Sequence, residues 1–311
     1  MKIFYSLYSL EGKPSFTDRS GALLRFVFDD GSMGYADCHP WVELGDLPLS
    51  EQLSCLRQGK WTPLTLQSKK HAQIDASGRV EHNNLFDGLH IPSSHWLLTT
   101  PIEEIPEGFS SVKIKVGRHS EEEIPTLRDL FQQLPHSVKV RLDFNAKLSQ
   151  KNFVAYLEKI LQWKERIDFI EDPYPYDCRS WEETQHKLGV AFACDRQSEK
   201  HQGNTLSHRV SVVKPAVQDA GAFFPTHDLV VTSYLDHPLG QLAAAYHAAL
   251  MQKTFPGKVL PCGLLSHYAY QTNAFSEQMG RTESVLLPPK GTGFGFDDLL
   301  LQQQWTLLAC Q

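Results

Sequence analysis

The chain has 311 residues, of which 41% are hydrophobic and 21% charged, and these values indicate a folded globular protein rather than a disordered one. Its formal net charge of −6 argues against a nucleic-acid-binding protein, which usually carries a basic excess. No apolar run approaches the roughly 20 residues that a membrane span needs, and the first residues lack the apolar stretch of a secretion signal. We therefore expect a cytoplasmic protein with no nucleic-acid or membrane partner, and the length predicts about two domains.

The placement of cysteine and histidine argues against disulfide scaffolds and zinc proteins. The six cysteines, at positions 38, 55, 178, 194, 262 and 310, form no Cys-x-x-Cys pair, and a chain of this length folds without disulfides. The 14 histidines are scattered and form no His-Glu-x-x-His motif. We expect reduced thiols and no zinc site.

The first 95 residues predict mixed strands and turns. The segment Ala22–Phe28 has the composition of a strand, and Asp29–Ser32 is a turn signal before a second short strand at Met33–Ala36. Together these segments predict a β-hairpin. The tail, residues 285–311, lacks any strand–helix alternation, and we expect it to return to this N-terminal unit.

Between residues 96 and 284, short β-branched runs alternate with amphipathic stretches such as Glu121–Gln133 and Asn152–Lys164. This alternation predicts βαβ units and a parallel sheet. Seven strand candidates, with an eighth possible at Gly263–Ser266, favour a compact (β/α) barrel, and a doubly wound open sheet is the alternative. The seven candidates are His95–Thr100, Ser111–Val116, Val138–Asn145, Ile167–Pro173, Ala191–Asp195, Arg209–Pro215 and Leu229–Leu235.

Charged side chains recur at the carboxyl ends of five successive candidates. Residues i and i+2 of a strand share a face, so covering the apolar face with helices directs these side chains into the barrel. Taken singly, each has an ordinary explanation as a solvated strand face, a helix cap or a surface lysine. Their shared register instead favours a site at the rim where barrels place their chemistry. The charged residues are Lys113, Lys115, Arg141, Asp143, Glu171, Asp195 and Lys214, and the polar Asn145 shares the face of Arg141 and Asp143.

In a barrel, the carboxylates of Asp143, Glu171 and Asp195 would converge. Two carboxylates about 4 Å apart repel by about 4 kcal/mol at an effective dielectric constant of 20, and a divalent cation removes that cost. An all-oxygen set of ligands suits Mg²⁺ or Mn²⁺. A lysine beside another lysine and a metal has a lowered pKa, so Lys115 or Lys214 could remove a proton next to the carboxylate of a small-molecule substrate.

These motifs resemble those of the enolase superfamily, in its muconate-lactonizing subgroup. The matching segments are VKIKVG, RLDFN, FIEDP, CD and VVKP, over about residues 110–265. Within the subgroup, RLDFN, VVTSYLDHPLG and the final Cys-Gly-Leu segment resemble the o-succinylbenzoate synthase family. The resemblance implies a modified barrel of the (β/α)7β type, residues 96–284, with an α+β capping domain formed by residues 1–95 and completed by the tail.

By position, the resemblance implies a role for each charged residue. Lys115 would be the acid/base residue, Lys113 its neighbour that tunes its pKa, and Lys214 the cation across the substrate. The implied metal ligands for Mg²⁺, or Mn²⁺, are Asp143, Glu171 and Asp195, and the implied substrate contacts are Arg141, Asn145, Ser233 and Gly263.

The implied activity is that of a lyase. It is the Mg²⁺-dependent dehydration of 2-succinyl-6-hydroxy-2,4-cyclohexadiene-1-carboxylate to 2-succinylbenzoate through an enediolate, a step of menaquinone biosynthesis. An N-acylamino-acid racemase or dipeptide epimerase of the same superfamily is the alternative, and a non-catalytic binding member is a second one.

Two features depart from the family pattern. Arg196 follows Asp195 where the family commonly has glutamate. About 14 residues separate Lys214 from the next strand candidate, which predicts a lost or truncated barrel helix.

Overall fold

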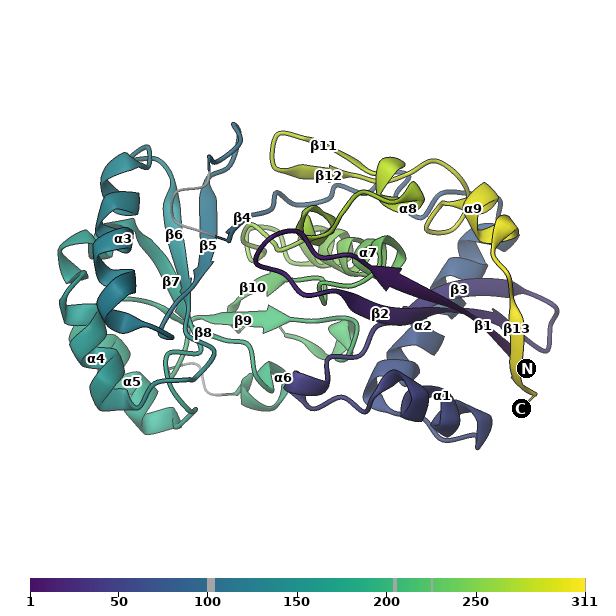
Figure 1. Ribbon diagram of the computed structural model, residues 1–311, viewed down its shortest axis with the longest axis horizontal. Coiled ribbons are helices and arrows are strands. Elements are labelled where there is room, and N and C mark those ends of the chain that lie inside the picture. The colour runs from purple at the N-terminus through teal and green to yellow at the C-terminus, as the bar shows by residue number, and fades with distance from the viewer. Residues whose placement is uncertain (100–103, 204–205, 225, 311) are drawn as a thin grey trace.

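The computed structural model describes residues 1–99, 104–203, 206–224 and 226–310. Within these residues the chain builds an antiparallel sheet at one end of the molecule and a larger parallel sheet at the other, as Figure 1 shows. This arrangement confirms the predicted fold class, a (β/α) barrel with an N-terminal α+β unit. In the same residues no helix is long and apolar enough to cross a membrane.

The antiparallel sheet contains the predicted hairpin, because β2 and β3 pair from Ala22 opposite Cys38 onwards. Its strands lie in the order β13, β1, β2, β3 within the described residues. They span Lys2–Leu10 (β1), Arg19–Val27 (β2), Met33–Cys38 (β3) and Thr306–Cys310 (β13). Lys2 lies opposite Cys310, so a strand from the end of the chain completes the sheet. The domain boundaries at residues 95 and 284 stay a prediction.

Helices α1 and α2 pack against this sheet. They span Leu49–Arg57 and Pro63–Val80, and the 3₁₀ turn η1 spans Val42–Leu44. A capping box of Thr62 and Thr65 satisfies backbone groups at the start of α2. This helix lies so close to β3 that a Cβ on Gly34 would be 1.9 Å from the Ala72 carbonyl oxygen, a contact that only glycine avoids.

The parallel sheet confirms the seven strand candidates, because β4 to β10 are hydrogen-bonded in sequence order within the described residues. The strands are Trp96–Leu98 (β4), Ser111–Lys115 (β5), Lys139–Asp143 (β6), Ile167–Glu171 (β7), Phe192–Cys194 (β8), Val210–Val213 (β9) and Asp228–Val231 (β10). Thr100, the last residue of the first candidate, lies outside the described residues.

The helices of the barrel differ in length. The helices and 3₁₀ turns are α3 Ser120–Gln133, α4 Gln150–Glu158, η2 Leu161–Arg166, α5 Cys178–Leu188, α6 Ser198–His201, η3 Ala220–Ala222 and α7 Pro238–Thr254. Of these, α3, α4, α5 and α7 are well formed, whereas α6 and η3 are short. The predicted helix at 152–164 therefore ends at Glu158 and continues as a 3₁₀ turn. Among the described residues between β9 and β10, only η3 is helical, which confirms the predicted truncation.

The barrel closes through an irregular segment, residues 258–263, and not through a strand at Gly263–Ser266, so that prediction was wrong. On one side the Leu229 N–H donates to the Lys258 carbonyl at 2.8 Å. On the other, the His95 N–H donates to the Cys262 carbonyl at 2.8 Å. Pro261 lacks an N–H group, so this segment forms isolated bridges rather than a continuous ladder. Closure rules out the doubly wound open sheet.

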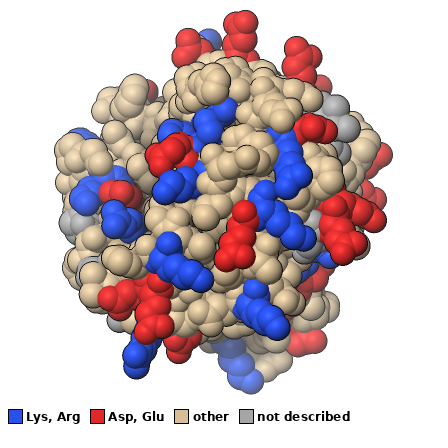
Figure 2. All heavy atoms as spheres, turned by 90° about the vertical axis from the view of Figure 1, so that its left-hand side faces the viewer, with Lys and Arg blue, Asp and Glu red and all other residues tan. Residues whose placement is uncertain are grey.

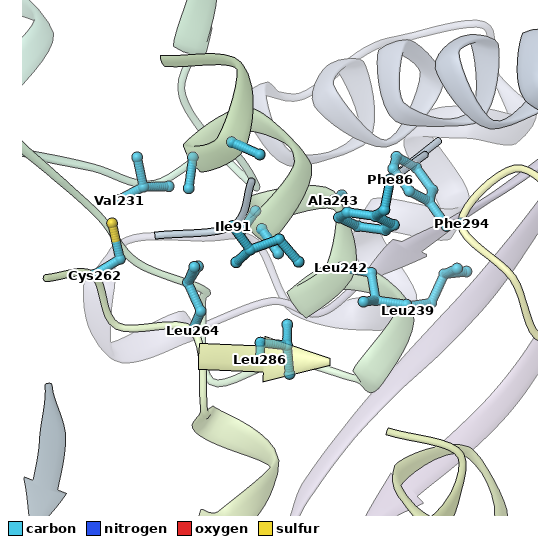
Figure 3. Close-up of a cluster of buried hydrophobic side chains, with 14 of the residues drawn as sticks. Phe86, Ile91, Val231, Leu239, Leu242, Ala243, Cys262, Leu264, Leu286 and Phe294 are labelled. Atoms are coloured by element: carbon cyan, nitrogen blue, oxygen red, sulfur yellow. The ribbon is translucent and has the colours of Figure 1, made fainter. Parts of the chain in front are cut away.

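The remaining elements lie after the closing segment. They are η4 Ser266–Ala269, α8 Ala274–Glu277, β11 Gly280–Thr282, β12 Val285–Leu287 and α9 Asp297–Gln302. Side chains from several of these regions share one apolar cluster around α7, in which Figure 3 shows Phe86, Leu242 and Leu286 among others. This cluster joins the N-terminal unit to the second half of the barrel.

A separate apolar cluster lies between the strands of the first half of the barrel and helices α3 to α5. Fully buried members such as Leu142, Phe153 and Phe192 come from both layers, so the outward face of the strands is apolar as expected. The outer surface of this side carries interspersed positive and negative side chains (Figure 2). The charged residues inside the barrel therefore stand apart from an ordinary mixed surface.

Candidate active site

The strand register brings the predicted residues to one end of the barrel. Lys115 lies opposite Asp143 in the β5–β6 pair, and Asp143 lies opposite Glu171 in the β6–β7 pair. Asp195 and Lys214 directly follow β8 and β9. These five side chains come from the carboxyl ends of parallel strands, and we call this place the barrel mouth.

Lys113 connects two of the carboxylates. Its Nζ lies 2.6 Å from Glu171 Oε1 and 3.0 Å from Asp143 Oδ2. Burial alone would lower the pKa of Lys113, but Asp143 and Glu171 outweigh burial, so this pKa lies above the ordinary lysine value. Lys113 is therefore a fixed positive charge and not a proton acceptor.

Lys214 is paired with the third carboxylate. Its Nζ lies 2.5 Å from Asp195 Oδ2 and 6.0 Å from the centre of the Tyr234 ring. Burial opposes the charged form, but Asp195 and then Glu171 outweigh burial and raise the pKa of Lys214. Like Lys113, Lys214 keeps its proton.

Lys115 differs from both of these lysines. No ion pair holds its ammonium group within the described residues, and the side chain reaches solvent at the mouth. The surrounding protein nevertheless desolvates the amine, and this desolvation, together with the positive charges of Lys113 and Lys214, outweighs Asp143 and lowers the pKa of Lys115. Of the three lysines, Lys115 is the one suited to accept a proton.

The carboxylates respond to these charges in opposite directions. Burial raises the pKa of Glu171 to about 7, because its lysine partners do not fully offset the loss of water and the charges of Asp143 and Asp195. Burial acts on Asp143 too, but Lys113 and Lys115 outweigh it and lower its pKa. Asn145 also supports Asp143, since its side-chain amide donates to Asp143 Oδ1 at 2.9 Å.

The donor set at the mouth fits a divalent cation. Three carboxylates come from neighbouring strands, and the Oδ1 atom of Asp195 is buried without a hydrogen-bond partner in the described part of the chain. In those residues no three carboxylate, imidazole or thiol groups are already grouped to hold a metal ion. Lysine ammonium groups lie between the carboxylates and supply the positive charge that a cation would otherwise bring.

Sequence reasoning missed Asp172 as a part of this site. It is buried, and its Oδ1 accepts the backbone N–H of Asp195 at 3.0 Å, which fixes the start of the loop after β8. Arg196 lies beside it, with Nε 3.8 Å from Asp172 Oδ2. The arginine that departs from the family pattern therefore partly balances a buried carboxylate.

The predicted substrate contacts do not all lie at the mouth. Ser233 follows β10, and its hydroxyl donates to the Ser266 hydroxyl at 2.7 Å. Gly263 belongs to the closing segment, where its carbonyl accepts the Ser233 N–H at 3.0 Å. Arg141 is fully buried below the mouth and pairs with Asp168 at 2.7 Å. The structure therefore brings Ser233 and Gly263 together and directs Arg141 elsewhere.

The N-terminal unit reaches the barrel beside Lys214. The Trp41 indole N–H donates to the Tyr234 carbonyl at 2.6 Å, and the Tyr234 hydroxyl donates to Asp46 at 3.1 Å. Sequence reasoning did not find this contact, because it joins residues almost 200 positions apart. It places the loop after β3 next to the mouth.

Comparisons with known proteins agree with the motifs. A family profile described as "O-succinylbenzoate synthase, N-terminal domain" matches residues 3–78, and one described as "Enolase C-terminal domain-like" matches residues 102–297. The o-succinylbenzoate synthase of Bdellovibrio bacteriovorus is 34% identical over 328 residues, with 98% of this chain and 98% of that protein covered.

Solved structures share the fold at lower identity. The dipeptide epimerase from Enterococcus faecalis V583 has a TM-score of 0.74 at 15% identity, covering 94% of this chain and 98% of its own. The L-Ala-D/L-Glu epimerase from Bacillus subtilis has a TM-score of 0.73 at 16% identity, covering 95% and 98%. The muconate lactonizing enzyme from Pseudomonas putida has a TM-score of 0.72 at 15% identity, covering 98% and 96%.

At these identities the solved structures establish the fold alone, and the curated relative and the profiles establish the family. Enzymes of the enolase superfamily bind a divalent metal ion, generally Mg²⁺. The family predicted from the motifs is thus confirmed. The chain belongs to the o-succinylbenzoate synthase family of the enolase superfamily.

Proposed function

We propose that this chain is a lyase that dehydrates 2-succinyl-6-hydroxy-2,4-cyclohexadiene-1-carboxylate to 2-succinylbenzoate. Family membership supports the reaction, since the curated relative of this name matches over nearly the whole chain. The observation that carries the assignment of roles is the contrast among three lysines. Lys115 has a lowered pKa and faces solvent, whereas Lys113 and Lys214 are held charged by carboxylates.

In this mechanism the neutral Nζ of Lys115 takes the proton α to the ring carboxylate. The electron pair of the broken C–H bond moves into the carboxylate, giving an enediolate, and the ammonium groups of Lys113 and Lys214 offset the charge that develops. When the enediolate collapses, the β-hydroxyl leaves with the proton that Lys115 had taken. Water is the leaving product, and Lys115 is neutral again. Aromatisation of the ring makes the step favourable.

We assign Asp143, Glu171 and Asp195 as the residues that would hold Mg²⁺, with Mn²⁺ as a substitute. Such a cation, when bound, supplies positive charge to the substrate carboxylate and so acidifies its α-proton. The buried, unpaired Oδ1 of Asp195 supports this assignment. Ser233 and Gly263, with Asn145 beside Asp143, are the proposed substrate contacts, and the cytoplasm is the proposed location.

The function is tested with purified protein, Mg²⁺ and the cyclohexadiene carboxylate, by following loss of the diene absorbance. We expect turnover that EDTA abolishes and Mg²⁺ restores. Lys115→Ala should lower kcat by about 10²–10⁴-fold, the usual contribution of a positioned general base. Full activity in that variant would contradict the assigned role, and absence of turnover in the wild type with Mg²⁺ bound would contradict the function.

The same lysines distinguish dehydration from racemisation. A racemase needs one proton acceptor on each face of its substrate, but Asp195 holds Lys214 charged. We therefore expect no deuterium exchange into N-succinyl amino acids in ²H₂O. Rapid exchange by the wild type, lost in Lys214→Ala, would favour the racemase alternative.

A further inference from the structure

Arg141 lies inside the barrel but turns away from the mouth. The register of β6 and β7 shifts after Val140, so that Asp168 is skipped and its carboxylate accepts the Arg141 Nε–H at 2.7 Å. The guanidinium lies 4.5 Å from the centre of the Phe169 ring, and Nη1 donates to the Pro261 carbonyl. With these contacts Arg141 has no exposed surface, and its Nη2 has no hydrogen-bond partner within the described residues.

Arg141 also contacts the imidazole of His95. Its Nη1 lies 2.9 Å from His95 Nδ1. A guanidinium has only donors, so Nδ1 must accept, and the proton of the neutral ring must lie on Nε2. Burial, Arg141 and Lys113 together lower the pKa of His95 well below the ordinary value, which keeps the ring neutral. Arg141 therefore sets both the charge and the tautomer of His95.

The Nε2 edge of His95 lies against the closing segment of the barrel. A Cβ built on Gly263 would lie 3.2 Å from His95 Nε2, 3.1 Å from Cε1 and 2.9 Å from Thr232 Cγ2. Val213 pairs with Val231 at the end of the β9–β10 ladder. The residues that follow them, Lys214 and Thr232, are therefore neighbours. His95, directly before β4, thus lies beside Gly263 and Thr232, and Thr232 is the neighbour of Lys214. His95 keeps 7% of its surface exposed, and within the described residues its one hydrogen bond to another side chain is the one between Nδ1 and Arg141.

We propose that His95 donates a hydrogen bond from Nε2 to a substrate oxygen at the floor of the barrel mouth, and that Arg141 is a positioning residue that acts through His95. This inference deepens the proposed function and rests on it. The proposed substrate carries a ketone and a second carboxylate besides the ring carboxylate, and either offers such an oxygen. A neutral donor can bind this oxygen without adding a further positive charge beside Lys113, Lys214 and Arg141.

The tautomer is tested first, because this measurement needs no substrate. Long-range ¹H–¹⁵N correlation spectra of the ¹⁵N-histidine-labelled protein separate the two neutral tautomers, and His95→Gln identifies the His95 signals. We expect a neutral Nε2–H ring across pH 6–8, and a loss of this single tautomer in Arg141→Lys. An Nδ1–H ring, donating to the Pro261 carbonyl instead, would overturn the inference.

Kinetics then test the contact with substrate. His95→Leu should raise KM about 10- to 100-fold, with a smaller change in kcat, as expected when a hydrogen bond is lost from both the bound and the reacting state. His95→Gln, whose amide nitrogen can replace Nε2–H, should recover part of the loss. His247→Leu is the matched control, since that histidine packs on His71 and lies outside the proposed machinery. An unchanged KM in a folded His95→Leu protein would contradict the proposal.

The two failures are distinguishable. If the wild type does not dehydrate the diene carboxylate, the proposed function fails, whatever the tautomer of His95. If the wild type turns over but His95→Leu behaves like His247→Leu, only the further inference fails. Arg141→Lys separates a structural from a positioning role of Arg141. If the role were purely structural, the substitution would lower stability without changing the His95 tautomer.

Discussion

The barrel mouth and the interface between the barrel and the N-terminal sheet each bury carboxylates close together. At the mouth, Lys113 and Lys214 lie within 3.0 Å of Asp143, Glu171 and Asp195. At the interface, Asp37 in β3 meets Asp236 after β10, and no ion pair to either carboxylate occurs within the described residues. Cations stabilise the first group, so the second must be stabilised in some other way.

The interface pair is held by neutral donors. The Tyr8 hydroxyl donates to Asp37 Oδ1 at 2.6 Å, and the His237 N–H donates to Asp37 Oδ2 at 3.0 Å. Both Oδ2 atoms crowd Gly240, since a Cβ there would lie 2.6 Å from that of Asp236 and 2.8 Å from that of Asp37. Burial raises the pKa of Asp236 to about 7, and burial followed by the charge of Asp236 raises that of Asp37.

The histidines that surround this pair in the described part of the chain are neutral near pH 7. Burial lowers the pKa of His39 and His237 to about 3, and that of His71 well below the ordinary value. The remaining neighbours are the Tyr8, Tyr234 and Tyr270 hydroxyls and the Cys38 thiol, whose pKa values burial raises. At the mouth, lysine ammonium groups compensate the negative charge of the buried carboxylates. At the interface, a proton bound by the carboxylate pair does so instead.

The largest effect is expected from removing a cation at the mouth. Lys113→Met leaves Asp143 and Glu171 buried without their shared partner, which should cost about 3 kcal/mol of stability at pH 8. Urea unfolding without Mg²⁺ measures this loss. Adding Mg²⁺ should restore more stability to the variant than to the wild type. Equal stability of the two proteins without Mg²⁺ would show that the lysine does not stabilise the carboxylates.

The interface pair should instead make stability depend on pH. The raised pKa of Asp236 means that the folded state holds a proton that the unfolded chain releases above about pH 4. Its contribution to stability is therefore full below about pH 4 and is lost as the pH rises to about 7, by up to about 1.4 kcal/mol per pH unit. Asp236→Asn should show a flatter decline over this window in urea unfolding. Parallel pH profiles of variant and wild type would contradict the claim that folded Asp236 holds a proton over this pH range.

A smaller effect is expected at the edge of the pair. Tyr8→Phe removes the hydroxyl that donates to Asp37, a loss of about 1.5 kcal/mol for a hydrogen bond to a charged group. That bond favours the ionised carboxylate, so its removal should raise the pKa of Asp37. The midpoint of the pH-dependent decline in stability should therefore lie at a higher pH in the variant than in the wild type. A midpoint that moves to lower pH would contradict the assigned direction of this hydrogen bond.

The smallest effect is expected where a carboxylate meets water. Asp228 at the start of β10 pairs with Lys258 at 3.6 Å, and both side chains are about two-fifths exposed. Asp228→Asn makes the same chemical change as Asp236→Asn and should alter stability by less than about 0.5 kcal/mol at any pH. A larger or pH-dependent change would mean that removal of any aspartate, and not burial, explains the interface result.

The residues of the barrel mouth could be predicted from the sequence because their placement depends on the alternation of side chains within single strands. The alternation in SVKIKV and VRLDFN places Lys113, Lys115 and Asp143 on one face, and parallel strands bring such faces together. Arg141 follows the same alternation and lies inside the barrel, but a register shift opposite it turns Asp168 towards its guanidinium, which is buried below the mouth. A bulge of this kind leaves no signal in a strand pattern.

The interface could not be predicted, for a different reason. Asp37 and His237 are 200 residues apart, and no local sequence pattern links them. The closing segment was misplaced by a few residues because Pro261 breaks the strand pattern where the ring closes. Contacts between distant segments depend on the finished fold, and a single sequence offers no periodicity that encodes them.

The pairing of β13 with β1 bears on how the chain folds. Strands β1, β2 and β3 can form as consecutive hairpins early in synthesis, but their sheet lacks its last strand until residues 306–310 have left the ribosome. The whole barrel is translated in between. Because contacts between such distant segments slow folding, β1 is an open strand edge for most of synthesis. We therefore expect the nascent chain to depend on chaperones most strongly before β13 emerges, although β13 is among the shortest strands of its sheet.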